Sequence, residues 1–214
     1  MTASGVQELN TEEKIKSVAR KVFLEKGFAG TKIRDIADQA EINIALLNYY
    51  FRSKEKLFLV ILKESLVELL SGTFQIFSDK NLSFEEKIHR VVDNDIQALQ
   101  KNPLLASFVF SEIVHQHPEE IIKIFPKVLD LESLHIVEQY KEGIASGRFR
   151  NIPYRNFFGS IRAMVMQPFL EKPIHCLIHH PDKCLENSEE IFDEYLQTQK
   201  KLIIEMALSY LIIK

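Results

Sequence analysis

The sequence is poor in the residues and segments that mark several classes of protein. It has only seven glycines and seven prolines in 214 residues, so long stretches of turns are not expected. Its two cysteines, Cys176 and Cys184, suit a reducing compartment better than a disulfide framework. No apolar run reaches the roughly 18 residues of a membrane span, and the first residues lack the basic and apolar regions of a signal peptide. We therefore expect a soluble cytoplasmic protein with no membrane partner.

The motifs of common enzyme classes are also missing. The sequence has no glycine-rich phosphate loop, no G-x-S-x-G turn and no H-E-x-x-H motif. Candidate metal ligands gather in one segment, at His175, Cys176, His179, His180 and Cys184. Their spacing matches no zinc signature, and two nearby prolines make the local conformation irregular, so surface or interface roles are the alternative. We expect no catalytic residue, no metal and no cofactor.

Helical periodicity is what the sequence does have. Hydrophobic residues make up 46% of the chain, enough to bury a core, and they recur at intervals of three and four. The pattern predicts helices beginning near Thr11, Thr31, Asn43 and Ser53, each with a side chain that can cap the first turn. The fourth of these extends to about Phe77. Later helices are predicted at 83–100, 103–116, 121–146, 153–170 and 188–213. The expected fold class is all-α.

Residues 31–51 carry the clearest functional motif. They are T-K-I-R-D-I-A-D-Q-A-E-I-N-I-A-L-L-N-Y-Y-F, two short helical segments joined by a tight turn, which is the layout of a helix-turn-helix. The small side chain of Ala37 lets the second segment approach closely, and Leu47 packs back from that segment. Asn48 and Tyr49 are then left on the outer face, where they can bond bases or phosphates.

Three stretches around this motif together resemble the TetR family of bacterial repressors. They are F-x-E-K-G-F-x-G-T at 23–31, I-R-D-I-A at 33–37 and N-Y-Y-F-R-S-K-E-K-L-F at 48–58. The resemblance implies a three-helix DNA-binding domain with a recognition helix at about 44–49, and a fourth helix that links it to a helical-bundle regulatory domain. Two positions differ from the family pattern. Glu41 stands where a turn with positive φ usually has Gly, and Asn48 stands where Tyr is frequent.

The expected domains follow from the motif and the charge distribution. Residues 1–56 hold ten Lys or Arg against eight Asp or Glu, whereas the remaining chain has an excess of acid. We predict a DNA-binding domain at 1–56, and a ligand-binding and dimerisation domain at 57–214. Lys54, at the start of a helix, can bind a phosphate beside backbone N–H groups. The candidate DNA contacts are Thr31, Lys32, Arg34, Asn43, Ile44, Ala45, Asn48, Tyr49, Tyr50 and Lys54.

The second domain is expected to bind an effector and a second copy of the chain. A mostly apolar lining suits a small hydrophobic effector, with Arg162 available to an anionic group if it points inward. The candidate lining residues are Phe74, Phe77, Phe108, Ser111, His115, Tyr140, Met164 and Gln167. Surplus apolar residues on the 153–170 and 188–213 helices predict an intermolecular four-helix bundle in a homodimer. The candidate interface residues are Phe157, Ile161, Val165, Phe192, Tyr195, Leu202 and Met206.

These features predict a sequence-specific DNA-binding transcriptional regulator, a repressor that its ligand releases from double-stranded, palindromic operator DNA. Activation rather than repression is an open alternative. Others are a DNA-binding protein that senses no ligand, a stand-alone helical ligand-binding module and an all-helical enzyme. A filled regulatory core would favour the first of these three.

Overall fold

The computed structural model describes residues 3–115, 131–179 and 188–213. Within these ranges the chain is helical, and the one strand-like pairing is an isolated antiparallel bridge between Phe149 and Ile212. The predicted all-α fold is therefore confirmed. Of the described residues, one compact unit takes 3–68 and 107–115, and the other takes 69–106, 131–179 and 188–213. The functional boundary at residue 56 stays a prediction.

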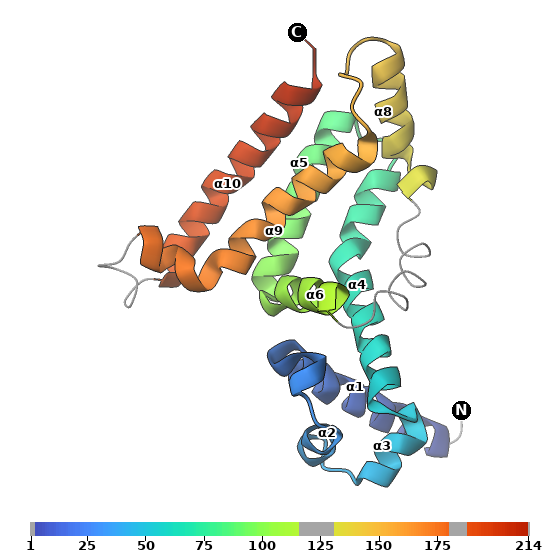
Figure 1. The fold of residues 1–214 in the computed structure, drawn as a ribbon. Coiled ribbons are helices and arrows are strands. Elements are labelled where there is room, and N and C mark those ends of the chain that lie inside the picture. The colour runs from blue at the N-terminus through green and yellow to red at the C-terminus, as the bar shows by residue number, and fades with distance from the viewer. Residues whose placement is uncertain (1–2, 116–130, 180–187, 214) are drawn as a thin grey trace. The chain divides into compact units, whose positions relative to one another are not determined.

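The first unit contains α1 (Ala3–Gly30), α2 (Ile33–Gln39), α3 (Ile44–Phe51) and the beginning of α4 (Lys54–Ser78) (Figure 1). The sequence predicts a helix beginning near Thr11, but α1 begins earlier, at Ala3, and no proline interrupts the residues between. Gly27, near the end of α1, takes a left-handed φ of 66°, which glycine adopts without steric cost. The core of this unit includes Ile15, Ala19, Val22, Phe23, Ile36, Ala37, Ala40, Leu47 and Phe58.

The second unit contains the rest of α4, α5 (Phe84–Lys101), η1 (Leu131–Ser133), α8 (His135–Ala145), α9 (Tyr154–His179) and α10 (Ser188–Leu211). Helix α6 (Leu104–His115) has residues in both units. Helix α5 packs against α8, α9 and α10, and α9 lies beside α10 (Figure 1). An aromatic cluster fills one end of this interior: Phe84, Tyr140, Phe149, Phe157 and Phe158.

Helix α9 continues beyond the point where the sequence predicts its end. Pro173 was expected to stop it after Leu170, yet the helix extends to His179. A proline inside a helix costs about 3 kcal/mol because one N–H donor is lost. Contacts on both sides of Pro173 offset that cost: Phe169 packs edge-on against Phe192, with centroids 5.7 Å apart, and His175 stacks on α10. None of the described helices combines the length and apolar character that a membrane crossing requires.

Candidate DNA-binding site and regulatory unit

The turn between α2 and α3 has the backbone that a helix-turn-helix needs. Glu41 adopts a positive φ of 54°, so this residue keeps the left-handed conformation that Gly would favour. The turn is closed by the Ile42 N–H, which donates to the Ala37 carbonyl at 3.0 Å. The Glu41 carboxylate pairs with Lys14 Nζ at 3.1 Å, which partly neutralises an acid near the motif.

Helix α3 has one face fixed and one face open. Leu47 and Phe51 are buried, whereas Ala45, Asn48 and Tyr49 are exposed, Tyr49 with 70% of its surface accessible. Ile44 and Tyr50, at the edges of the open face, are half-buried. The predicted cap is confirmed, because Asn43 Oδ1 accepts from the Leu46 N–H at 2.7 Å. The open face therefore offers a phenol, an amide and a methyl group to a partner.

The predicted DNA contacts at the start of α2 differ in exposure. Lys32 and Arg34 are exposed. Thr31 is only 2% exposed, and its hydroxyl donates to the Gly27 carbonyl at 2.7 Å. The prediction that Thr31 caps α2 is wrong, since Lys32 is the N-cap residue and makes no side-chain cap. The Thr31 hydroxyl instead satisfies the end of α1.

Lys54 contacts the connection between α1 and α2. Its ammonium donates to the carbonyls of Phe28 at 2.9 Å and Thr31 at 3.0 Å, and lies 4.0 Å from the centroid of the Phe28 ring. The sequence predicts a phosphate contact for Lys54, whereas in the structure the residue is half-buried and two of its three donors are engaged by backbone carbonyls. Lys54 therefore holds the α1–α2 turn against the start of α4.

Glu112 on α6 completes the same turn, and sequence reasoning missed it. Its Oε1 accepts from the Phe28 N–H at 2.9 Å, and the side chain is 4% exposed. A Cβ on residue 27 would lie 2.8 Å from that oxygen, so Gly27 is needed for both its φ and the space it leaves. The signal available was an isolated acid in the otherwise apolar helix LLASFVFSEIVH.

The predicted effector residues are distributed over both units. Phe77 packs against Phe158 with centroids 5.2 Å apart, and the buried Tyr140 packs against Phe158 at 5.8 Å, so these two candidates share a neighbour. The Tyr140 hydroxyl donates to the Ile152 carbonyl at 3.0 Å. The other candidates are placed differently: Phe74 is half-buried, Phe108 and Ser111 belong to the first unit, Gln167 is exposed beside Glu171, and the side chain of His115 lies outside the described residues.

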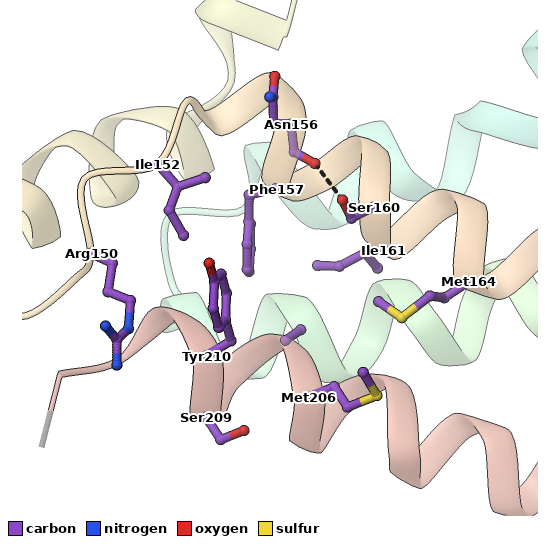
Figure 2. Close-up of a pocket in the computed structure, with 11 residues that line it drawn as sticks. Arg150, Ile152, Asn156, Phe157, Ser160, Ile161, Met164, Met206, Ser209 and Tyr210 are labelled. Atoms are coloured by element: carbon purple, nitrogen blue, oxygen red, sulfur yellow. Dashed lines mark hydrogen bonds between the residues drawn. The ribbon is translucent and has the colours of Figure 1, made fainter.

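The predicted dimer residues lie along α9 and α10, where the structure has an apolar groove of about 580 Å³ (Figure 2). Phe157 and Ile161 lie at its wall, as does Met164, which the sequence assigned to the effector. Val165 and Phe192 are already buried within the chain, and Tyr195 is half-buried. The large apolar side chains that remain exposed on α10 include Leu202, Met206 and Tyr210.

The candidate metal ligands are mostly outside the described part of the chain. His175 is buried, and its ring lies 3.9 Å from the Tyr195 ring. The side chains of Cys176 and His179, and residues His180 and Cys184, are not among those described. Within the described residues, no group of three His, Cys, Asp or Glu side chains is placed to hold a metal ion.

Comparisons with known proteins agree with this geometry. Residues 15–61 match the family model described as bacterial regulatory proteins, tetR family. The chain is 25% identical over 167 residues to the probable HTH-type transcriptional regulator YttP of Bacillus subtilis, covering 77% of this chain and 79% of that protein. It is 33% identical over 125 residues to the HTH-type transcriptional repressor NicS of Pseudomonas putida, covering 58% of this chain and 49% of NicS.

The fold has solved counterparts. A TetR family transcription regulator from Marinobacter aquaeolei VT8 superposes with a TM-score of 0.66 at 17% identity, over 100% of both chains. The matched residues contain α2, α3 and their left-handed turn. The protein is a DNA-binding transcriptional regulator of the helix-turn-helix class. Its residues 15–61 carry the helix-turn-helix domain of the tetR family of bacterial regulatory proteins, as the sequence motifs predicted.

Proposed function

We propose that the protein is a homodimeric repressor that binds a palindromic operator through α3 and leaves it when a small hydrophobic effector binds the second unit. The observation that carries the proposal is the division of α3 into a packed face and an open face bearing Asn48 and Tyr49. Lys32 and Arg34 add exposed positive charge before and within α2. The name of the relative NicS, a transcriptional repressor, supports the sign of regulation.

The DNA-binding proposal is tested with Tyr49→Ala and Arg34→Ala. Duplexes are first selected from a random-sequence pool by the wild-type protein, and affinities are then measured by fluorescence anisotropy at several salt concentrations. Tyr49→Ala should weaken binding by about 1–3 kcal/mol, because it removes a contact from the open face of α3. Arg34→Ala should lower the slope of log affinity against log salt by about 1, as expected for one lost phosphate contact.

The matched control is Lys80→Ala, which removes an exposed charge from the second unit. It should leave both affinity and salt slope unchanged. Wild-type affinity in both test variants would show that α3 and α2 do not face DNA as proposed.

The homodimer is supported by the groove between α9 and α10. One recognition helix covers one half-site, and a two-fold dimer matches the symmetry of a palindrome. Met206 and Tyr210 line this groove and expose 50% and 65% of their surfaces, and Leu202, one turn before Met206 on α10, exposes 45%. Surface of this kind is costly in water and is covered when two copies pair their α9 and α10 helices.

Release by an effector is the second half of the proposal. Helices α4 and α6 each have residues in both units, so a change in either helix can reach the turn held by Lys54 and Glu112. Linkage requires that an effector which lowers operator affinity binds the operator complex more weakly by the same factor. A ligand identified by mass spectrometry of the purified protein, titrated calorimetrically with and without operator, tests this. Equal affinities would favour a regulator that senses no ligand.

A further inference from the structure

Helices α4, α5 and α9 bring polar side chains into the apolar interior of the second unit. Thr73 lies on α4, Asn94 and Asp95 on α5, and Arg162 on α9. Thr73 Oγ1 donates to Asp95 Oδ1 at 2.7 Å, and Asn94 Nδ2 donates to the same oxygen at 3.1 Å. The residues one turn away on these helices are buried and apolar: Leu69, Phe77, Val91, Leu99, Phe158, Val165 and Met166. The cluster therefore lies on the inner faces of three helices.

Gly72 keeps this arrangement possible. A Cβ at position 72 would overlap the Asn94 amide, so any larger residue would displace the side chain that supports Asp95. The glycine costs α4 about 1 kcal/mol of helix propensity. Close packing of α4 against the polar part of α5 explains why it is present.

Arg162 is the unsatisfied member of the cluster. Among the described residues its guanidinium donates no hydrogen bond and forms no ion pair. Burial lowers the pKa of the guanidinium, and the negative charge of Asp95 acts in the opposite direction. Burial also raises the pKa of the Asp95 carboxyl. An unpaired guanidinium in such surroundings is costly, because its five donors have left water without gaining acceptors.

The guanidinium is nevertheless within reach of a small molecule. In the described part of the chain, the fully buried side-chain polar atoms without a partner are Ser65 Oγ and Glu112 Oε2. Arg162 is half-buried, so the residue keeps part of its surface accessible. Asp95 is likewise half-buried, and both of its hydrogen bonds go to Oδ1, which leaves Oδ2 for another donor.

We propose that Arg162 and Asp95 bind a neutral hydroxyl group of an otherwise apolar effector, whose oxygen accepts from Arg162 and whose proton is donated to Asp95 Oδ2. An anionic group would be repelled by Asp95, and a cationic group by Arg162, so a dipolar neutral group fits the pair best. The apolar body would lie against Phe77 and Phe158, which are one helical turn from Thr73 and Arg162 and pack together at 5.2 Å. This inference rests on the proposed effector function.

The test uses three probes with one chain length: 1-decanol, decanoate and decylamine. Each is titrated calorimetrically into the full-length protein without DNA, with decanoate and decylamine below their critical micelle concentrations and 1-decanol below its solubility limit. Wild type should bind 1-decanol at least about tenfold more tightly than either charged probe, a difference of 1.4 kcal/mol. Asp95→Asn should shift the preference to decanoate, because Arg162 is then the unmatched charge. Arg162→Gln should shift it to decylamine.

Gln97→Glu is the control, since it adds a charge to the exposed face of α5 and should leave the order of affinities unchanged. Circular dichroism establishes that each variant is folded. If Arg162→Gln does not fold, Arg162→Lys takes its place and should retain the preference for 1-decanol. General destabilisation would weaken the binding of all three probes. It cannot make Asp95→Asn prefer decanoate and Arg162→Gln prefer decylamine.

The proposal is overturned if no probe binds, if a charged probe binds wild type most tightly, or if all folded variants keep one order of affinities. Any of these results would exclude Arg162 and Asp95 as a binding site for a neutral hydroxyl group. Operator release is measured separately with 1-decanol. Binding with the expected selectivity but without release would establish the hydroxyl site and contradict the proposed effector function.

Discussion

At the scale of single residues, polar side chains of the first unit serve the backbone before they serve a partner. The Thr31 hydroxyl donates to the Gly27 carbonyl, and the Lys54 ammonium donates to the carbonyls of Phe28 and Thr31. The Glu112 carboxylate accepts from the Phe28 N–H. These groups satisfy the last turn of α1 around Gly27, whose positive φ interrupts the regular helix. The position of α2 thus depends on hydrogen bonds from α4 and α6.

Removing the Lys54 ammonium should destabilise the fold. Lys54→Met keeps the length of the side chain but removes two hydrogen bonds to half-buried carbonyls and the contact with the Phe28 ring. We expect a loss of about 1–3 kcal/mol in the free energy of unfolding, measured by urea denaturation. Lys56→Met, at an exposed position of the same helix, should stay within about 0.5 kcal/mol of wild type. Equal losses in the two variants would contradict the role assigned to Lys54.

At the scale of elements, caps determine where several helices begin. Asn43 caps α3, and Ser53 Oγ accepts from the Lys56 N–H at the start of α4. Helix α5 begins with a reciprocal capping box, in which Ser83 Oγ accepts from the Glu86 N–H and the Glu86 carboxylate accepts from the Ser83 N–H at 2.9 Å. Each cap satisfies donors that the first turn of a helix leaves unpaired.

The capping box makes the stability of α5 depend on pH. The Ser83 N–H and hydroxyl lower the pKa of the Glu86 carboxyl from its ordinary 4.5. A lowered folded-state pKa contributes stability above 4.5, and this contribution is lost as the pH falls through the folded value. Wild type should therefore be more stable than Glu86→Gln at pH 7, with the difference decreasing as the pH falls below 4.5 and through the lowered folded-state pKa. Chemical denaturation at several pH values measures it.

Ser83→Ala provides the comparison for that experiment. In its background, Glu86→Gln should change stability by less, and with less dependence on pH, because the hydroxyl partner of the carboxylate is absent. A pH-dependent difference of the same size in both backgrounds would assign the effect to other charges around α5.

At the scale of the whole molecule, α9 and α10 together present an apolar surface that one chain leaves uncovered. Leu202→Glu or Met206→Glu would place a charge in the proposed interface and should convert the dimer to monomer at micromolar concentration, because a buried unpaired charge costs several kcal/mol. Analytical ultracentrifugation measures the change. Gln197→Glu, which adds the same charge on the opposite side of α10, should leave the dimer intact. A wild-type monomer, or dimers in all three variants, would exclude this interface.

Local physical chemistry made much of the molecule predictable from the sequence. Helix periodicity, the caps at Asn43 and Ser53 and the left-handed Gly27 depend on residues a few positions apart, and the spacing of Ala37, Leu47 and Tyr49 was enough to place the helix-turn-helix. Residue type alone did not predict the backbone at Glu41. This non-glycine residue adopts the left-handed turn conformation, and its carboxylate pairs with Lys14.

Tertiary structure decided the partners of the polar side chains. Glu112 accepts from a backbone N–H 84 residues away, Lys54 donates to carbonyls at the end of α1, and Arg162 on α9 is acted on by the charge of Asp95 on α5. The continuation of α9 past Pro173 depends in the same way on contacts with α10. Helical spacing specifies which side chains share a face, but not which distant helix that face meets. Those outcomes follow from how the helices pack, because burial makes each polar group find a partner wherever the fold supplies one.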